Sequence, residues 1–138
     1  MKHHSLLFLL LLVFAVGCGN KQLTVQGKVV FSDDGSPLTM GNVIFSNTTF
    51  QASGPIDTKG HFTMGSYSEK DGVPPGTYKV AVTGATVDVD ATGLNVYDLI
   101  EPKFSSPSLS GIEVTIDKTV KNLEIKVDRN PRKNPLAK

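Results

Sequence analysis

Cys18 is the only cysteine in the 138-residue chain and the residue whose position most clearly indicates covalent chemistry. It follows Gly17 and an uninterrupted apolar stretch over residues 6–16. In a protein exported to an oxidising compartment, a cysteine without a disulfide partner would remain a reactive thiol. Attachment of a lipid to the sulfur would remove that thiol, so we expect Cys18 to be a lipidation site.

The residues before Cys18 have the organisation of a secretory signal peptide. A short basic start that contains Lys2 precedes the apolar stretch, which is the order of a signal peptide. The eleven apolar residues are too few to cross a bilayer, because a spanning helix needs about 20 residues. We therefore predict that residues 1–17 are a signal peptide that is removed.

The end of this leader, Val16-Gly17-Cys18, resembles the lipobox of bacterial lipoproteins, although Ala15 stands where that motif usually has leucine. The resemblance implies a mature chain that begins at Cys18, carries palmitate-type acyl chains there, and uses residues 18–22 as a tether. Two or three chains would hold the protein stably, since each buried methylene adds about 0.8 kcal/mol. This predicts a lipid-anchored protein of the cell envelope, in the outer membrane or on the outer face of the cytoplasmic membrane. The alternative is an ordinary secretory signal in which Cys18 is incidental.

A second candidate for chemistry is the start of a calcium-loop pattern formed by Asp88, Asp90, Thr92 and Gly93. Alternating oxygen ligands with a glycine at the bend are typical of such loops. The pattern then fails, because Leu99 occupies the position where a bidentate glutamate should close the site. We therefore expect neither a metal nor any other cofactor.

His61 is the only histidine after the leader, so it would have to serve alone in any metal or acid–base site. One histidine without nearby carboxylates does not make a metal site. The chain also has no nucleophile-elbow glycine pattern around the serines that lie closest together in sequence, which are Ser105, Ser106, Ser108 and Ser110. The residues therefore predict no catalytic centre, and we expect His61 to be exposed on a strand.

The charge balance excludes one class of partner. The chain has fourteen Lys plus Arg and thirteen Asp plus Glu, and removal of Lys2 with the leader leaves thirteen of each. Nucleic-acid binding depends on clustered positive charge, so we expect no nucleic-acid partner. The length fits one domain, predicted over residues 23–128, followed by a disordered basic tail at 129–138.

Apolar residues alternate with polar ones along most of the mature chain, which is the pattern of half-buried strands. We predict strands at residues 23–31, 42–48, 61–66 and 77–83, a further one within 49–56, and a final hairpin formed by 112–116 and 123–127. Glycine and proline separate these segments, and no helical period is evident. The pattern predicts an all-β fold, an antiparallel β-sandwich of about seven strands.

Four short motifs resemble the carboxypeptidase regulatory-like domain. They are a G-x-V strand at Gly27, a P-L-x-x-G-x-V strand at Pro37, a D-x-x-G-x-F hairpin at Asp57 and a P-G-x-Y-x-V strand at Pro75. The resemblance covers residues 23–84 and implies an Ig-like, prealbumin-like (transthyretin-like) sandwich of the kind found in small bacterial lipoproteins. It implies no particular reaction, because function depends on the site that each such domain carries.

Residues 85–110 form the long connection between two predicted strands, and loops of this length are usually functional or disordered. The connection carries Asp88, Asp90, Tyr97, Asp98 and Phe104. One hypothesis is a partner-binding flap made by these side chains. The alternative, which we favour, is a solvated crossover that its apolar residues hold against the sandwich.

These observations predict a non-catalytic module that is attached to the membrane by its lipid and contacts an envelope protein or a polysaccharide. One alternative is a carbohydrate-binding module, for which Tyr67, Tyr97 and Phe104 are the only aromatic candidates outside the predicted core. A remote alternative is a transthyretin-like hydrolase. Hydroxyisourate hydrolases of that shape need several histidines and arginines and a Tyr-Arg-Gly-Ser terminus, whereas this chain ends in Asn-Pro-Leu-Ala-Lys.

Overall fold

A computed structural model describes residues 21–136 of the protein, which form nine strands and one short 3-10 helix. The strands are β1 (Val25–Phe31), β2 (Asn42–Ser46), β3 (Gln51–Pro55), β4 (His61–Thr63), β5 (Gly76–Thr83), β6 (Thr86–Asp88), β7 (Val96–Asp98), β8 (Glu113–Ile116) and β9 (Val120–Val127). The helix, η1, spans Pro102–Ser105. Within residues 21–136 there is accordingly no helix with the length and hydropathy to cross a bilayer.

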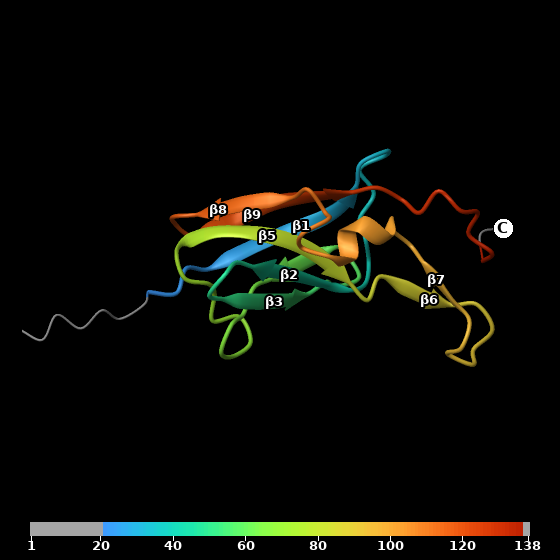
Figure 1. Ribbon diagram of the computed structural model, residues 1–138, viewed down its shortest axis with the longest axis horizontal. Helices are drawn as coiled ribbons and strands as arrows, with labels where there is room; N and C mark the ends of the chain where they lie inside the picture. Colours follow the sequence, from blue (N-terminus) through green and yellow to red (C-terminus); the bar gives the residue numbers. More distant parts are fainter. Residues whose placement is uncertain (1–20, 137–138) are drawn as a thin grey trace, which may run out of the picture.

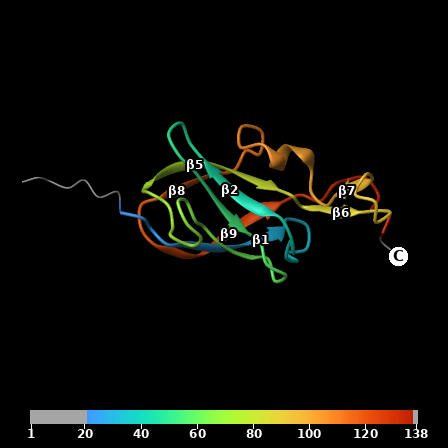
Figure 2. The same ribbon diagram turned by 90° about the horizontal axis from the view of Figure 1, so that it is seen from below.

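Two sheets face each other and enclose the core. One has the order β4-β1-β9, the other β3-β2-β5-β8, and β6 and β7 form a separate two-stranded sheet. Figure 2 shows β1 and β9 on one side of the sandwich and β2 and β5 on the other. The alternating residues of these strands point inward, as the fully buried Val29, Phe45 and Val80 illustrate. The prediction of an all-β sandwich is confirmed.

The last two strands do not form the predicted hairpin. β8 pairs antiparallel with β5 in one sheet, whereas β9 pairs parallel with β1 in the other. The connection at residues 117–119 therefore crosses from sheet to sheet. Alternation identified both segments as strands, but it says which face of a strand is buried and not which strand lies beside it. The sandwich is thus antiparallel except for the β1–β9 pair.

Gly27 shows how closely β1 and β9 approach. A Cβ atom at this position would lie 2.2 Å from the Leu123 carbonyl oxygen and 2.7 Å from the Phe62 ring. Only a residue without a side chain fits between a neighbouring strand and a core aromatic. The register of β1 against β9 also shifts between Val25 and Gly27.

Residues 85–110 contain more regular structure than the sequence predicts. β6 and β7 form a hairpin that projects beyond one end of the sandwich (Figure 1), and η1 then packs against β5. The described chain begins at the opposite end of the molecule in the same view. We call the hairpin end distal and the end where the described chain begins proximal.

Candidate binding surfaces

The structure separates the five residues predicted for a partner-binding loop into two groups. The carboxylates Asp88 and Asp90 are exposed on the hairpin and Asp98 is half-buried. The aromatics are buried: Tyr97 is 9% exposed and Phe104 is 5% exposed. The aromatic side chains therefore hold the segment to the domain. Their burial agrees better with a crossover held by its apolar residues than with a flap that offers these aromatics to a partner. The predicted lipidation site, Cys18, lies outside the described residues.

The turn of the hairpin is organised by Asp90. Its Oδ1 accepts hydrogen bonds from the Thr92 hydroxyl at 2.6 Å and from the Thr92 backbone N–H at 3.2 Å. These bonds lower the pKa of Asp90. The carboxylate stabilises its own turn, and residues 21–136 contain no cluster of three metal-ligating side chains. The exposed apolar groups here are Leu94, with 91% of its surface accessible, and Val96, with 53%.

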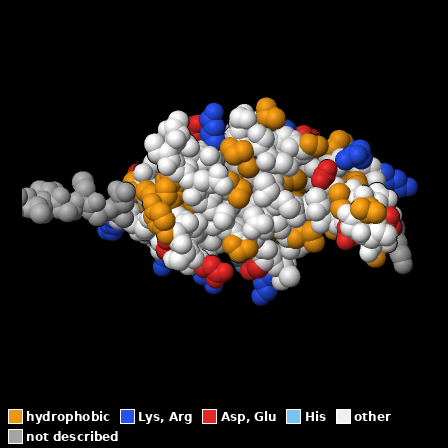
Figure 3. All heavy atoms as spheres, turned by 60° about the horizontal axis from the view of Figure 1, so that its bottom comes forward, with side chains coloured by type: hydrophobic (Ala, Val, Ile, Leu, Met, Phe, Trp, Pro, Cys, Tyr) orange, Lys and Arg blue, Asp and Glu red, His pale blue; other side chains and the backbone are white. Residues whose placement is uncertain are grey.

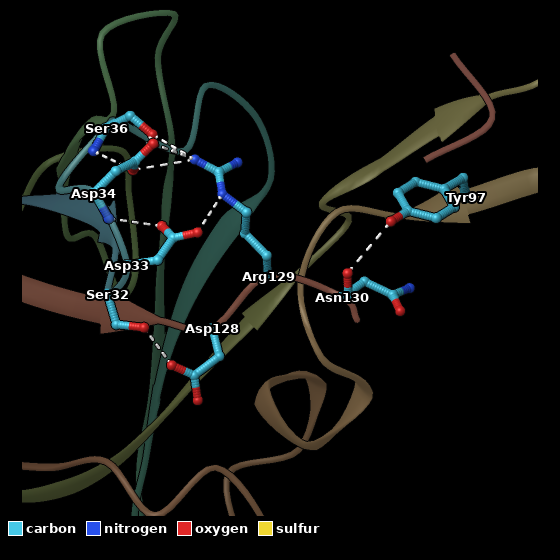
Figure 4. A network of polar contacts seen from close by, with 8 residues as sticks. All are labelled: Ser32, Asp33, Asp34, Ser36, Tyr97, Asp128, Arg129 and Asn130. Atoms are coloured by element: carbon cyan, nitrogen blue, oxygen red, sulfur yellow. Dashed lines mark hydrogen bonds and ion pairs between the residues drawn. The ribbon is translucent and has the colours of Figure 1, made fainter. Parts of the chain in front are cut away.

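A C-terminal latch, which we define as residues 129–132, holds the hairpin in place (Figure 4). The Tyr97 hydroxyl donates a hydrogen bond of 2.6 Å to the Arg132 carbonyl oxygen. The buried Asn130 donates from Nδ2 to the Asp98 carbonyl at 2.9 Å and accepts from the Arg132 N–H at 3.1 Å. The latch therefore provides hydrogen-bond partners for two polar groups of β7, the Tyr97 hydroxyl and the Asp98 carbonyl,.

Arg129 fixes the start of the latch to the turn after β1. Its Nε donates to Asp33 Oδ2 at 2.8 Å, and its Nη2 donates to Asp34 Oδ2 at 3.0 Å (Figure 4). The guanidinium also lies 3.7 Å from the centroid of the Phe31 ring, which is cation–π geometry,. Hydrogen bonds from Ser36, followed by the charge of Arg129, lower the pKa of Asp34 to about 2.

The predicted disordered tail therefore begins too early at residue 129. Residues 129–132 are attached to the domain by the latch contacts. The sequence carried no signal for this, because Arg129 and Asp33 are 96 positions apart. The basic residues predicted a tail in solvent, whereas Arg129 pairs with Asp33 and Asp34 in a distant turn.

Asp128 extends the same network to η1. It accepts hydrogen bonds from the Ser32 hydroxyl and, at 3.0 Å, from Lys103 Nζ. These bonds, with Ser32 first, lower the pKa of Asp128. Lys103 also pairs with Glu101 at 3.0 Å and lies 4.9 Å from the Phe104 ring centroid. The distal end is thus a fixed assembly of hairpin, helix and latch that leaves the hairpin tip exposed.

Towards the proximal end, an aromatic row runs from the core to the surface. Phe45 stacks on Tyr78 with ring centroids 5.7 Å apart. Phe50 meets the edge of Tyr78 at 6.3 Å and of Tyr67 at 6.0 Å. Tyr67, the last member, is 80% exposed. Of the three aromatics expected for a carbohydrate-binding surface, Tyr67 alone reaches solvent, because Tyr97 and Phe104 are buried.

The Tyr67 loop, residues 66–71, is held in shape by Asp71. Its carboxylate accepts from the backbone N–H groups of Ser66 at 2.6 Å, Tyr67 at 3.1 Å and Ser68 at 3.2 Å. These bonds lower the pKa of Asp71. The loop curls over Gly65, where a Cβ atom would lie 2.5 Å from the Ser68 carbonyl oxygen. A shallow groove of about 600 Å³ lies beside the loop, lined mainly by serine, threonine and charged side chains.

The histidine and serines do not form a hydrolytic arrangement in the described chain. His61 is exposed, as expected, and its Nδ1 lies 3.8 Å from Asp57 Oδ2. Asp57 in turn accepts from two backbone N–H groups, those of His61 and Lys59, which lower its pKa. The buried Ser110 donates its hydroxyl to the Val80 carbonyl. Neither interaction places a nucleophile beside a base.

No protein-family model matches the chain, and no curated protein matches its sequence. The membership suggested by the motifs at Gly27, Pro37, Asp57 and Pro75 therefore stays a prediction. Among solved structures, the chain is similar to BcpA, the major pilin subunit of Bacillus cereus, with a TM-score of 0.50 and 15% identity over 80% of this chain and 31% of that chain. It is also similar to a DUF3823 family protein from Bacteroides ovatus ATCC 8483, with a TM-score of 0.48 and 18% identity over 77% of this chain and 44% of that chain.

The likeness to the pilin subunit concerns the fold. At 15% identity it shows a similar all-β domain and no shared activity,. This chain spans less than half the length of either protein. The surfaces of this chain must therefore be interpreted from its own residues.

Proposed function

We propose that the protein is a lipid-anchored, non-catalytic module of the cell envelope that contacts an envelope protein or a polysaccharide with its distal end. One observation carries the proposal: the described chain begins at the end of the sandwich opposite the β6–β7 hairpin (Figure 1). A lipid on Cys18 would therefore present the hairpin on the side that faces away from the membrane.

Display of this kind requires no reaction centre. An anchor confines the domain to two dimensions and raises its effective concentration next to other envelope components, so that weak contacts become occupied. The hairpin suits this role because the latch and η1 fix its base before any partner binds. A pre-organised surface loses less conformational entropy on binding than a mobile loop does.

A protein partner fits the distal end better than a glycan. The exposed groups at the hairpin tip are Leu94 and Val96, with the carboxylates Asp88 and Asp90 close to them in the chain. Aliphatic side chains contribute to protein interfaces. Sugar stacking needs exposed aromatic rings, and the two aromatic residues of this segment, Tyr97 and Phe104, are both buried.

Site-specific photo-cross-linking in intact cells tests the proposal. A photoreactive residue at position 94 should capture one neighbour reproducibly, while the same residue at position 126, an exposed site on β9, should not. Position 126 is a matched control because Lys126 is also solvent-exposed but lies on the sandwich. The absence of any reproducible neighbour from position 94 would contradict a binding role for the distal end.

A further inference from the structure

Tyr67 is a large aromatic side chain that lies outside the buried core of the sandwich. It is 80% exposed, and its ring makes an edge contact with Phe50, at the end of the row that begins in the core. Its loop is fixed by three backbone hydrogen bonds to Asp71. The chain thus holds an amphipathic ring in place at the surface, with an apolar body and a polar hydroxyl.

The Tyr67 loop lies close to the point where the described chain begins. Leu23 and Val73 exchange backbone hydrogen bonds of 2.7 and 2.9 Å. Gly72 packs so closely on Leu23 that a Cβ atom would lie 2.3 Å from the Leu23 carbonyl oxygen. Asp71, which holds the Tyr67 loop, directly precedes Gly72. Figure 1 places this loop, between β4 and β5, in the half of the molecule where the described chain starts.

The tether leaves this region little freedom to move away from an anchored Cys18. Lys21 is three residues from Cys18, and an extended chain spans at most about 3.6 Å per residue, or roughly 11 Å in total. The headgroup layer of a bilayer is itself about 5–8 Å thick on each side. A lipid in the membrane would therefore hold Lys21 within the headgroup layer or at most a few ångströms beyond it.

We propose that the proximal aromatic surface, formed by Phe50 and the Tyr67 loop, rests in the headgroup region of the membrane that holds the lipid of Cys18. The inference depends on the proposed lipid anchor and adds to it the orientation of the domain. Tyrosine is enriched at membrane interfaces because its ring contacts acyl chains while its hydroxyl stays hydrated. A second contact of this kind stops the sandwich from turning about its tether and keeps the hairpin directed outward.

The surroundings of Tyr67 agree with a zwitterionic or mixed lipid surface. In Figure 3 one cluster of apolar side chains lies next to the start of the described chain, and charged side chains gather mainly at the rim of this face. Lys70 and Glu69 in the loop have opposite charges, and Asp71 is occupied by its backbone bonds. Within this loop the contact would therefore depend on the aromatic ring rather than on electrostatic attraction.

The chain offers a direct probe of this contact because it contains no tryptophan. Tyr67→Trp introduces a single fluorophore at the proposed contact, and Leu94→Trp introduces one at the distal tip, where the side chain is 91% exposed. Each full-length variant, expressed with its leader and purified in detergent, is reconstituted into vesicles of phosphatidylethanolamine and phosphatidylglycerol. The acyl chains carry bromine close to the glycerol, so that they quench tryptophan in the headgroup region.

The proposal predicts that both variants float with the vesicles, that the emission of Trp at position 67 shifts to shorter wavelength and loses most of its intensity, and that the emission from position 94 is unchanged. Flotation with equal emission from both positions would overturn the inference and leave the anchor intact. Failure to float would instead contradict the anchor. If a soluble neutral glucan alters the emission from position 67 in floating protein that lipid does not quench, the surface binds sugar and the membrane contact is wrong.

Discussion

Replacement of Asn130 by alanine should loosen the distal hairpin, because this side chain joins the latch to β7. Asn130 is 7% exposed, and its side chain donates to the Asp98 carbonyl at 2.9 Å and accepts from the Arg132 backbone N–H at 3.1 Å and from Arg132 Nε at 3.5 Å. Loss of a partner for a buried polar group costs about 1–3 kcal/mol. We therefore expect Asn130→Ala to lower the free energy of unfolding by about 2 kcal/mol, which corresponds to a fall in Tm of roughly 8 °C for a domain of this size.

Thermal unfolding followed by far-UV circular dichroism measures the global effect, and amide hydrogen exchange measures the local one. If the hairpin opens before the sandwich, exchange across Thr86–Asp98 should accelerate by about 30-fold for 2 kcal/mol. The matched control is Asn134→Ala, since Asn134 is half-buried and, among residues 21–136, its side chain accepts from the Leu136 N–H alone. Equal effects of the two substitutions, or no change in either measurement for Asn130→Ala, would refute the role of the latch.

Three further predictions concern packing, close backbone approach and pH. Phe104→Ala should reduce the free energy of unfolding, measured by urea titration, by about 3–5 kcal/mol because it leaves a cavity under η1. The control Leu109→Ala, at a residue 68% exposed, should change this free energy by less than about 0.5 kcal/mol, and similar losses for the two variants would contradict the packing of η1. Gly27→Ala should prevent stable pairing of β1 with β9, since its Cβ would meet a β9 carbonyl at 2.2 Å. Gly111→Ala has open space around it and should lower the free energy of unfolding by only about 1 kcal/mol, because its φ of +72° disfavours a side chain,. A folded Gly27→Ala variant with wild-type Tm would show that the register is wrong. The folded-state pKa of Asp34 is lowered to about 2 by hydrogen bonds from Ser36 and then by the charge of Arg129, so its stabilising contribution is complete above the unfolded pKa of about 3.9 and is lost as pH falls towards 2. Tm should therefore fall less steeply over this range in Asp34→Asn than in the wild type, and parallel pH profiles would count against the contacts of Asp34 with Ser36 and Arg129.

The strands of the sandwich could be predicted from sequence because their residues alternate regularly. Tyr78, Val80 and Val82 all point into the core, as period two requires,. The partner of each strand could not be predicted in the same way. Ile116 and Ile125 are both buried, yet their strands belong to different sheets. Alternation reports burial of a face, whereas pairing depends on contacts between distant segments.

The distal end was only partly predictable for a related reason. The apolar residues in 85–110 indicated that the segment is held against the sandwich, and the buried Ile100 and Phe104 agree with this. The hairpin itself has three residues in each strand, too few for a periodic pattern to emerge. The latch depends on side chains from opposite ends of the chain, such as Arg129 and Asp33, and no spacing rule connects them.

The proposed function requires a lipid on Cys18 that holds the sandwich at the membrane. Mass spectrometry of the N-terminal peptide from protein isolated from its native membrane tests it directly. We expect the peptide to begin at Cys18 and to carry the mass of a thioether-linked diacylglycerol. An N-terminus upstream of Cys18, or an unmodified thiol at that position, would show that the protein is not anchored in this way.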